Sequence, residues 1–205
     1  MSNRIALVAK RKSGKSTVAE MLVRSHGFTR MALAGPLKDS AVEMLNAWLA
    51  GQGVSRNAVR GRVIIRQSDK PITRDELEAN KATFRPLLEW LGTTFGREYL
   101  RTPERWIEQF SEALPSDTRV VVDDMRQPNE ADALRAMGFV IVRIERPETE
   151  RLAELARCGE PMGVMASERF IDQIEADAVI DNTGDLSHLE AQVCAMAHWA
   201  RDEAA

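Results

Sequence analysis

The sequence has little of what membrane, disulfide-linked or nucleic-acid-binding proteins need. No apolar run approaches the roughly 20 residues that span a bilayer, and the N-terminus shows no signal-peptide pattern. The two cysteines, Cys158 and Cys194, lack the spacing of a metal site and are expected to be reduced thiols. The net charge of −3 is not the basic excess typical of proteins that bind nucleic-acid polymers. We therefore expect a cytoplasmic protein that binds neither a membrane nor a nucleic-acid polymer.

Histidine is scarce near every candidate motif, and internal repeats and low-complexity tracts are missing. His26, His188 and His198 fall on expected helices or helix ends, so we interpret them as surface or packing residues. The composition is otherwise ordinary, with 44% hydrophobic and 29% charged residues. At 205 residues the chain is long enough for a single domain with a substantial core.

One stretch suggests a specific chemistry: Ala9-Lys10-Arg11-Lys12-Ser13-Gly14-Lys15-Ser16-Thr17. It follows the apolar run Ile5–Val8 and precedes a helical pattern, so the predicted order is strand, tight loop, helix. At such a loop the first N–H groups of the helix point at an anion, a lysine adds charge at the β- and γ-phosphates, and a hydroxyl binds Mg²⁺. Lys15 and Ser16 stand at those two positions. The stretch therefore predicts a site for a nucleoside triphosphate.

The loop departs from the pattern G-x-x-x-x-G-K-[ST] at its first residue, which is Ala9, and it carries three basic residues where such loops often hold another glycine. Alanine suits the first position only if the backbone does not need a positive φ there. A basic surface turn before an ordinary helix is the alternative interpretation. The strand before the loop and the amphipathic helix after it favour phosphate binding.

A second candidate element is Arg119–Asp124, where the β-branched run Val120–Val122 ends in two carboxylates. Such a run is typical of a strand buried on both faces of a parallel sheet, and acids at its carboxyl end stand where a phosphate-loop protein holds Mg²⁺. We predict that Asp124 serves the metal together with Ser16. Arg126 follows immediately and adds positive charge to the same edge.

Strands and helices alternate along the chain, which predicts an α/β fold with a doubly wound, five-stranded parallel sheet flanked by helices. The expected strands are Ile5–Val8, Phe28–Leu33, Arg119–Val122, Val140–Ile144 and Ala178–Asp181. We expect one domain over residues 1–205, with an acceptor-side insert at about 51–85 and a lid-like segment at about 148–175.

Turn and cap residues predict where several helices begin. Gly35-Pro36 predicts a helix start with Lys38 in its first turn, where a lysine opposes the helix dipole, and this favours contact with a substrate. Thr73 has capping-box spacing to Glu76. Pro86 predicts a further helix start, and Thr102-Pro103 precedes a helix that carries Trp106.

The residues near these motifs favour transfer of a phosphoryl group to another phosphate. Such an acceptor is already ionised and needs no general base, but it needs positive charge to bring two phosphates together. Arginines supply that charge. An acceptor hydroxyl would instead favour a carboxylate base, for which Asp39 is the candidate.

Over its whole length the chain resembles the deoxynucleoside monophosphate kinases of tailed bacteriophages, which are P-loop enzymes of the nucleoside-monophosphate-kinase type. The resemblance rests on five short segments in order: Ser13–Thr17; Pro36–Lys38; Leu91-Gly92-Thr93 with Arg97 and Trp106; Asp124–Arg126 with Asn129-Glu130; and Asp181-Asn182 with Gly184. It implies transfer of the γ-phosphate of ATP to a deoxynucleoside monophosphate. The implied cofactors are ATP and Mg²⁺, and the implied partners are small-molecule nucleotides.

The resemblance also carries roles onto the matching residues. It implies catalytic roles for Lys15, Arg97, Asp124 and Arg126; ATP binding by Ser13, Gly14, Lys15, Ser16, Thr17, Asn182 and Gly184; substrate binding by Lys38, Arg85, Arg97, Trp106 and Arg126; and metal binding by Ser16 and Asp124. In this picture the loop from Asn182 to Gly184 lies beside the base of ATP.

Two other hypotheses stay open at this point. Lys10–Lys15 together with Gly35–Lys38 is similar to animal-type phosphomevalonate kinases, which also phosphorylate a phosphate, whereas Leu91–Thr93 and Asn129-Glu130 favour the phage type. A non-catalytic ATP-binding switch is the other hypothesis, although it would not need so complete a set of charged residues. The apolar face of the helix that contains Trp48 also offers a surface for a homodimer.

Overall fold

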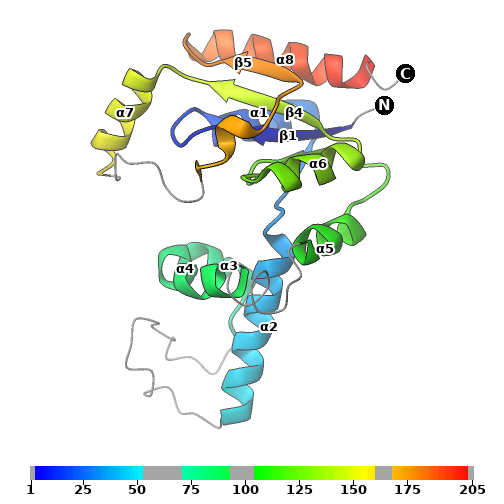
Figure 1. Ribbon diagram of the computed structural model, residues 1–205, viewed down its shortest axis with the longest axis vertical. Helices are drawn as coiled ribbons and strands as arrows, with labels where there is room; N and C mark the ends of the chain where they lie inside the picture. Colours follow the sequence, from blue (N-terminus) through cyan, green and yellow to red (C-terminus); the bar gives the residue numbers. More distant parts are fainter. Residues whose placement is uncertain (1–2, 53–70, 93–103, 160–167, 203–205) are drawn as a thin grey trace. The chain divides into compact units, whose positions relative to one another are not determined.

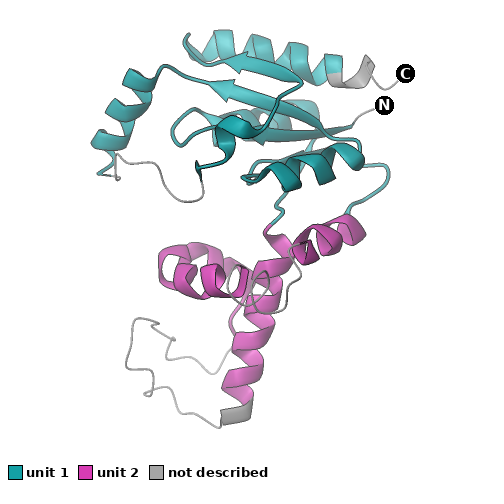
Figure 2. Ribbon diagram, viewed as in Figure 1, with its two compact units in different colours: residues 1–33, 114–205 teal, residues 34–113 magenta. Residues whose placement is uncertain are grey.

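The structure is a computed structural model that describes residues 3–52, 71–92, 104–159 and 168–202 (Figure 1). The chain divides into two compact units (Figure 2). The first, called the sheet unit here, comprises Met1–Leu33 and Leu114–Ala205. The second, the helical unit, is the continuous segment Ala34–Ala113. Within the described ranges no helix is both long and apolar enough to cross a membrane.

The sheet unit confirms the predicted α/β fold, because it contains a five-stranded sheet whose paired strands are all parallel. Its elements in chain order are β1 (Arg4–Val8), α1 (Lys15–His26), β2 (Thr29–Met31), β3 (Val120–Val122), α6 (Pro128–Ala136), β4 (Val140–Glu145), α7 (Glu148–Arg157), a short 3-10 helix (Ile171–Gln173), β5 (Ala178–Asp181) and α8 (Leu186–Asp202). The strand order is β2-β3-β1-β4-β5. The apolar strand β1 therefore lies in the middle of the sheet.

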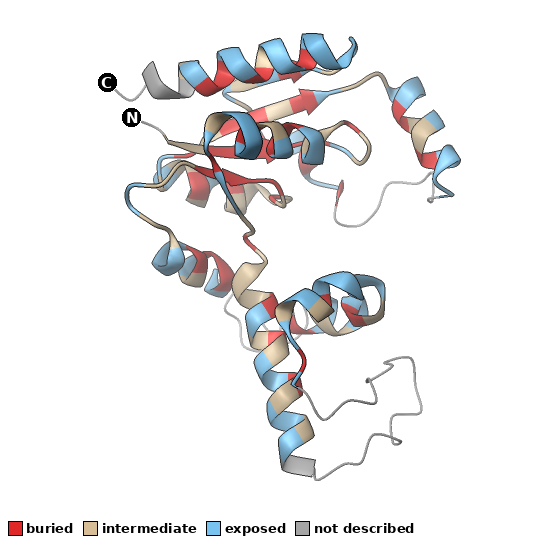
Figure 3. Ribbon diagram, turned by 180° about the vertical axis from the view of Figure 1, so that it is seen from behind, coloured by how far each residue is buried: buried red, intermediate tan, exposed pale blue. Residues whose placement is uncertain are grey.

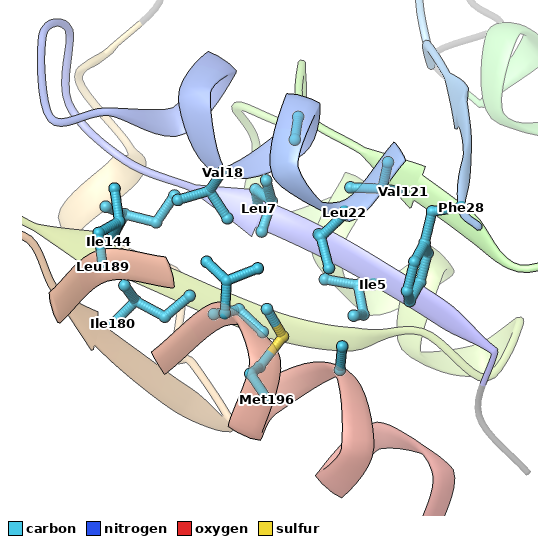
Figure 4. Packing of buried hydrophobic residues seen from close by; sticks show 14 of the residues in the cluster. Ile5, Leu7, Val18, Leu22, Phe28, Val121, Ile144, Ile180, Leu189 and Met196 are labelled. Atoms are coloured by element: carbon cyan, nitrogen blue, oxygen red, sulfur yellow. The ribbon is translucent and has the colours of Figure 1, made fainter. Parts of the chain in front are cut away.

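The main core lies between one face of the sheet and helices α1 and α8 (Figure 4). Because side chains alternate along a strand, Ile5 and Leu7 of β1 share this face, and both are fully buried. Leu22 of α1 and Leu189 of α8 complete the same cluster. Burying each such side chain contributes about 1.5–3 kcal/mol, so packing rather than helix propensity holds these elements in place. Figure 3 shows the buried residues concentrated along the strands.

The connections out of β1 and β3 run in opposite directions along the sheet. From β1 the chain continues through α1 to β2, whereas from β3 it continues through α6 to β4 on the other side of β1. The two strands pair directly, with Ala6 opposite Val122. Loops that leave neighbouring strand ends in opposite directions open the position where ligands bind in open α/β sheets.

The helical unit consists of four helices in the described ranges. They are α2 (Gly35–Gln52), α3 (Arg74–Ala79), α4 (Lys81–Glu89) and α5 (Arg105–Ala113). They pack around a second cluster of buried side chains: Ala41, Leu45, Ile72, Leu77, Phe84, Leu91 and Trp106. The helix start at Gly35-Pro36 is confirmed, as is the cap at Thr73, whose hydroxyl accepts the Glu76 N–H at 3.2 Å.

The helix start expected at Pro86 is wrong, because α4 begins at Lys81 and Pro86 lies inside it. The first turn forms from Asn80, whose carbonyl accepts the N–H groups of Thr83 and Phe84 at 2.9 and 3.3 Å. The proline removes one hydrogen bond from α4, and the helix buries Phe84 in the helical unit. The insert at 51–85 and the lid-like segment at 148–175 each include residues outside the described ranges and remain predictions.

Candidate phosphate-binding site

The loop between β1 and α1 has the backbone of an anion-binding turn. Gly14 stands at the N-cap of α1 with φ 97°, and no side chain of the described residues caps this helix end. Lys12 also has a positive φ, 61°, which is uncommon outside glycine. The first N–H groups of α1, from Lys15 onward, have no acceptor within the helix. With the helix dipole behind them, these groups favour an anion at this position.

Gly14 is required by space as well as by backbone angle. A Cβ at this position would lie 2.4 Å from the Asn182 side-chain nitrogen. That nitrogen, Nδ2, donates a hydrogen bond to the carbonyl of Ser13 at 2.9 Å. Asn182, which we expected beside the base of ATP, therefore contacts the backbone of the phosphate loop itself.

The preceding loop carbonyls accept from two arginines that follow β4. Arg146 donates to the Lys12 carbonyl at 3.2 Å, and Arg151 makes a longer contact of 3.5 Å to the Arg11 carbonyl. Glu168 accepts from the backbone N–H and the side-chain Nε of Arg11 at 2.7 and 3.1 Å. Arg151 and Glu168 are both buried. The basic run of the loop is thus held by partners from a distant part of the sequence.

Lys15 is surrounded by charges of both signs. Burial and the nearby Arg126 lower its pKa from 10.5 to about 8, while the carboxylates of Asp123, Asp124 and Glu168 act in the opposite direction. The ammonium group is still protonated at neutral pH. A desolvated lysine with an arginine close by is the environment expected where a polyanionic ligand is to be neutralised.

The two adjacent acids after β3 have different partners. Asp123 is buried and forms a two-pronged ion pair with Arg30 of β2, which includes a 3.0 Å hydrogen bond from Nε to Oδ1. Asp124 is half-buried and accepts the backbone N–H of Leu33 at 2.8 Å. Asp123 is therefore committed to joining β2 and β3, and Asp124 is the better candidate for a metal.

The residues suit a magnesium ion that is bound mainly through phosphate. No cluster of three or more His, Cys, Asp or Glu side chains that suits a metal occurs in the described ranges. Ser16 is exposed in the first turn of α1, and Asp124 follows the neighbouring strand β3. One hydroxyl and one carboxylate are a small set of hard oxygen ligands, and Mg²⁺ typically takes so few from protein when it also binds substrate phosphates.

Arg126 and Gly184 also belong to the sheet unit. The backbone N–H of Arg126 donates at 2.8 Å to Glu130, which also accepts the N–H of Gln127 in the capping box that starts α6. Gly184 lies in the turn before α8, where a Cβ would come within 2.8 Å of the His188 ring. Thr17 is exposed in the first turn of α1. These placements leave the proposed ligand contacts of the three residues as predictions.

Of the predicted acceptor residues, Lys38, Arg85 and Trp106 lie in the helical unit, whereas Arg126 belongs to the sheet unit. Lys38 is buried, and its ammonium group donates to Glu78 of α3. Burial acts to raise the pKa of Glu78, but the hydrogen bond and charge of Lys38 outweigh it and hold this pKa below its usual value. Arg74 donates to the Gly35 carbonyl at 2.9 Å and pairs with Asp39. Lys38 thus has a protein partner, which an acceptor phosphate would have to displace.

The three other acceptor residues predicted for this segment, Arg85, Arg97 and Trp106, differ in exposure or lie outside the described residues. Arg85 is exposed on α4. Trp106 is buried on α5, and in the described part of the chain its indole N–H has no hydrogen-bond partner. Arg97 lies outside the described residues. The structure therefore brings Lys15, Asp124, Arg126 and Asn182 into one unit and places Lys38, Arg85 and Trp106 in the other.

Several residues of the loop's surroundings were not predicted from the sequence. Arg30, Arg146 and Glu168 make contacts that span between 93 and 157 positions of the chain. Arg151 was expected only as one basic residue of a lid-like segment. None of these residues stands in a motif, so no local signal marks them.

Comparison with known proteins gives only distant similarities. No protein-family model matches the chain. A protein of Acanthamoeba polyphaga mimivirus that carries the provisional name deoxynucleotide monophosphate kinase is 27% identical over 156 residues, which cover 70% of this chain and 74% of the relative.

Solved structures with a similar backbone fold have lower sequence identity to this chain than the mimivirus protein has. TT1252 from Thermus thermophilus is 22% identical with a TM-score of 0.47, over 95% of this chain and 96% of that chain. Dephospho-CoA kinase from Campylobacter jejuni is 15% identical with a TM-score of 0.49, over 100% and 99% of the two chains. The activity named for each of these proteins is a property of that protein.

Proposed function

We propose that this chain transfers the γ-phosphoryl group of ATP to the phosphate of a deoxynucleoside monophosphate, giving the nucleoside diphosphate and ADP. The observation that carries the proposal is the phosphate loop, in which an uncapped helix start follows Gly14 and a desolvated Lys15 comes next. The deoxynucleotide acceptor is supported by the resemblance noted in the sequence and by the mimivirus relative.

On the donor side, the helix start and Lys15 bind the β- and γ-phosphates of ATP. Arg126, whose charge reaches Lys15, stabilises the negative charge that develops on the transferred group. Ser16 and Asp124 would hold Mg²⁺, which when bound neutralises charge on the same phosphates. These residues need no movement of protons, since all of them act as fixed charges and dipoles.

On the acceptor side, an ionised phosphate oxygen attacks the γ-phosphorus. A new P–O bond forms, the bond from the γ-phosphorus to the bridging oxygen breaks, and its electron pair leaves with ADP. The candidate base for a hydroxyl acceptor, Asp39, is instead ion-paired with Arg74. Asp39 thus has a protein partner, as Lys38 does in Glu78. Lys38, Arg85, Arg97, Trp106 and Arg126 are the residues proposed for the acceptor.

The phosphomevalonate alternative rested partly on the basic run at the start of the loop. In the structure Lys10 pairs with Asp172 at 2.9 Å and Arg11 pairs with Glu168. The basic run therefore has protein partners, and its charge does not by itself indicate an acceptor.

A panel of acceptors tests the proposal. We expect ADP formation from ATP and Mg²⁺ to require dGMP, dTMP, dCMP or dAMP, and not to occur with phosphomevalonate. The matched control is Lys15→Ala, which should lower the rate by about 10²–10³ because one charge-assisted phosphate contact and its transition-state stabilisation are lost.

Two results would contradict the proposal. ADP formation with phosphomevalonate alone selects the alternative kinase. Binding of ATP without ADP formation for any acceptor indicates a nucleotide-binding switch.

A further inference from the structure

We infer that Asn182 is a positioning residue for the phosphate loop: by holding the Ser13 carbonyl, its side-chain amide aims the Gly14 N–H at the bound triphosphate. The inference deepens the proposed function and rests on its ATP site. It assigns Asn182 to the loop backbone, and not to the base of the nucleotide.

The peptide unit between Ser13 and Gly14 makes the connection. A trans peptide is planar, so its C=O and N–H point in opposite directions, and the structure contains no cis peptide bond in its described residues. The Ser13 carbonyl points toward Asn182, with 2.9 Å between Nδ2 and the oxygen. The Gly14 N–H on the same peptide therefore points away from Asn182. Fixing the carbonyl fixes the direction of the donor.

The loop needs such a restraint because its own sequence does not favour this conformation. Lys12 takes φ 61°, a backbone region that costs a residue with a Cβ roughly 1–2 kcal/mol. Gly14 has φ 97°, and glycine is the residue type whose backbone can most easily rotate to another conformation. A hydrogen bond to the carbonyl between these two residues reduces that freedom before any ligand binds.

Asn182 is itself held firmly enough to act as an anchor. Its backbone N–H donates to Glu145 at the end of β4 at 2.8 Å. Gln192 of α8 accepts the Asp181 N–H at 2.9 Å and donates to the Asp181 carbonyl at 2.7 Å. The Asp181 carboxylate accepts the Thr183 N–H at 3.1 Å. The turn is therefore tied to a strand and to a helix, and from it the Asn182 side chain extends to the loop.

The missing Cβ of Gly14 shows how closely the two groups fit. A methyl group there would meet the amide nitrogen at 2.4 Å, so the glycine leaves room for this hydrogen bond. A role for Asn182 at the nucleotide base would not require contact with the loop backbone.

The test is a titration of wild type, Asn182→Ala and Asn182→Asp with ATP and, separately, with inorganic tripolyphosphate, both with Mg²⁺. We expect Asn182→Ala to weaken both ligands by the same factor, about three- to tenfold, which is the usual effect of losing one neutral hydrogen bond. Asn182→Asp keeps the shape but has no donor and adds negative charge, so it should bind both ligands more weakly still. Asn80→Ala is the matched control, since the Asn80 amide also donates to a backbone carbonyl, that of Glu76 at 2.9 Å, but in the helical unit, and it should bind both ligands as wild type does.

Comparing ATP with tripolyphosphate distinguishes a role of Asn182 at the loop from a role at the nucleotide base. Tripolyphosphate has no base, so a loss for ATP without a loss for tripolyphosphate would overturn the inference and assign Asn182 to the base. Wild-type affinity in both Asn182 variants would overturn it as well. The titration contains no acceptor, so an equal loss for both ligands supports the inference even if no monophosphate is phosphorylated. An unchanged thermal unfolding midpoint in Asn182→Asp shows that the loss is not one of folding.

Discussion

Lys15 shows how strongly neighbouring groups can alter a single side chain. Its pKa of about 8 is lower than 10.5 because burial and Arg126 outweigh three nearby carboxylates. The folded chain thus releases this proton at lower pH than the unfolded chain does. Below pH 8 the charged lysine lowers the free energy of unfolding by roughly 3 kcal/mol, and this cost fades as the pH rises from about 8 to about 10.5.

This pKa predicts how triphosphate binding depends on pH. We expect the affinity for ATP–Mg²⁺ to fall by about half from pH 7 to 8 and then by up to about tenfold per pH unit, since the phosphates bind the protonated lysine. Calorimetry in two buffers of different ionisation enthalpy should show proton uptake on binding at pH 8.5 and little at pH 7.

Lys15→Arg is the control for this prediction. Its guanidinium stays charged over the whole range, so the variant should lose the pH dependence. The same fall in affinity in wild type and Lys15→Arg would assign the titration to another group.

The residues of the site differ in how far the sequence could reveal them. Gly14, Lys15 and Ser16 are adjacent and form a pattern with a known chemical purpose, so they were found directly. Asn182 was singled out from a resemblance, but its contact with Ser13 spans 169 positions and depends on the fold. Glu168 lies in no motif and was not found.

At the level of elements, two neighbouring carboxylates join the short strands β2 and β3 in different ways. Asp123 binds Arg30 within the strand pair, and Asp124 accepts the Leu33 N–H beyond the end of β2. Successive residues of an extended chain point to opposite sides. One acid can therefore support the sheet while the next serves its edge.

Substituting each acid should separate these two roles. In Asp124→Asn the remaining carbonyl oxygen still accepts from Leu33, so we expect an unchanged unfolding midpoint, a lower turnover and a shift of the Mg²⁺ dependence to higher concentration. Asp123→Asn should instead lower the free energy of unfolding by about 1–2 kcal/mol, because Arg30 is partly exposed and water replaces part of the lost pair. Kinetics over a Mg²⁺ series and chemical denaturation of both variants provide the measurements.

The reverse result for the two variants would reassign the metal ligand. If Asp123→Asn changed the Mg²⁺ dependence and Asp124→Asn did not, the metal ligand would be Asp123.

The strands were predicted well because strands that are buried on both faces of a parallel sheet have continuous apolar sequences, as in Val120–Val122. Helix boundaries were predicted where a cap residue decides them, as at Thr73. The start at Pro86 was wrong because α4 begins earlier, at Lys81, and packs Phe84 into the helical unit; such tertiary packing overrides local propensity.

At the scale of the whole molecule, the helical unit is one continuous insertion between β2 and β3. We predict that replacing Ala34–Ala113 with a Gly/Ser linker of about 15 residues, which reaches about 20 Å, leaves a folded sheet unit. This shortened chain should bind tripolyphosphate and ATP but form no ADP in response to a monophosphate, because Lys38, Arg85, Arg97 and Trp106 are gone. Circular dichroism and the titration described above check the two halves of the prediction.

The same chain with Lys15→Ala is the negative control for binding. A shortened chain that fails to fold would show that the sheet unit depends on the helical unit.

The central place of β1 has a consequence for how the protein is made. The strand that pairs with it on one side, β3, begins at Val120, and the one on the other side, β4, begins at Val140. At 5–20 residues per second a ribosome needs roughly 6–25 s to reach them, during which Ile5–Val8 has no sheet to join. Of the five strands of this sheet, β1 is thus synthesised before both of its neighbours and waits for them. We expect growing chains that end before Val140 to depend on chaperones that shield such a segment.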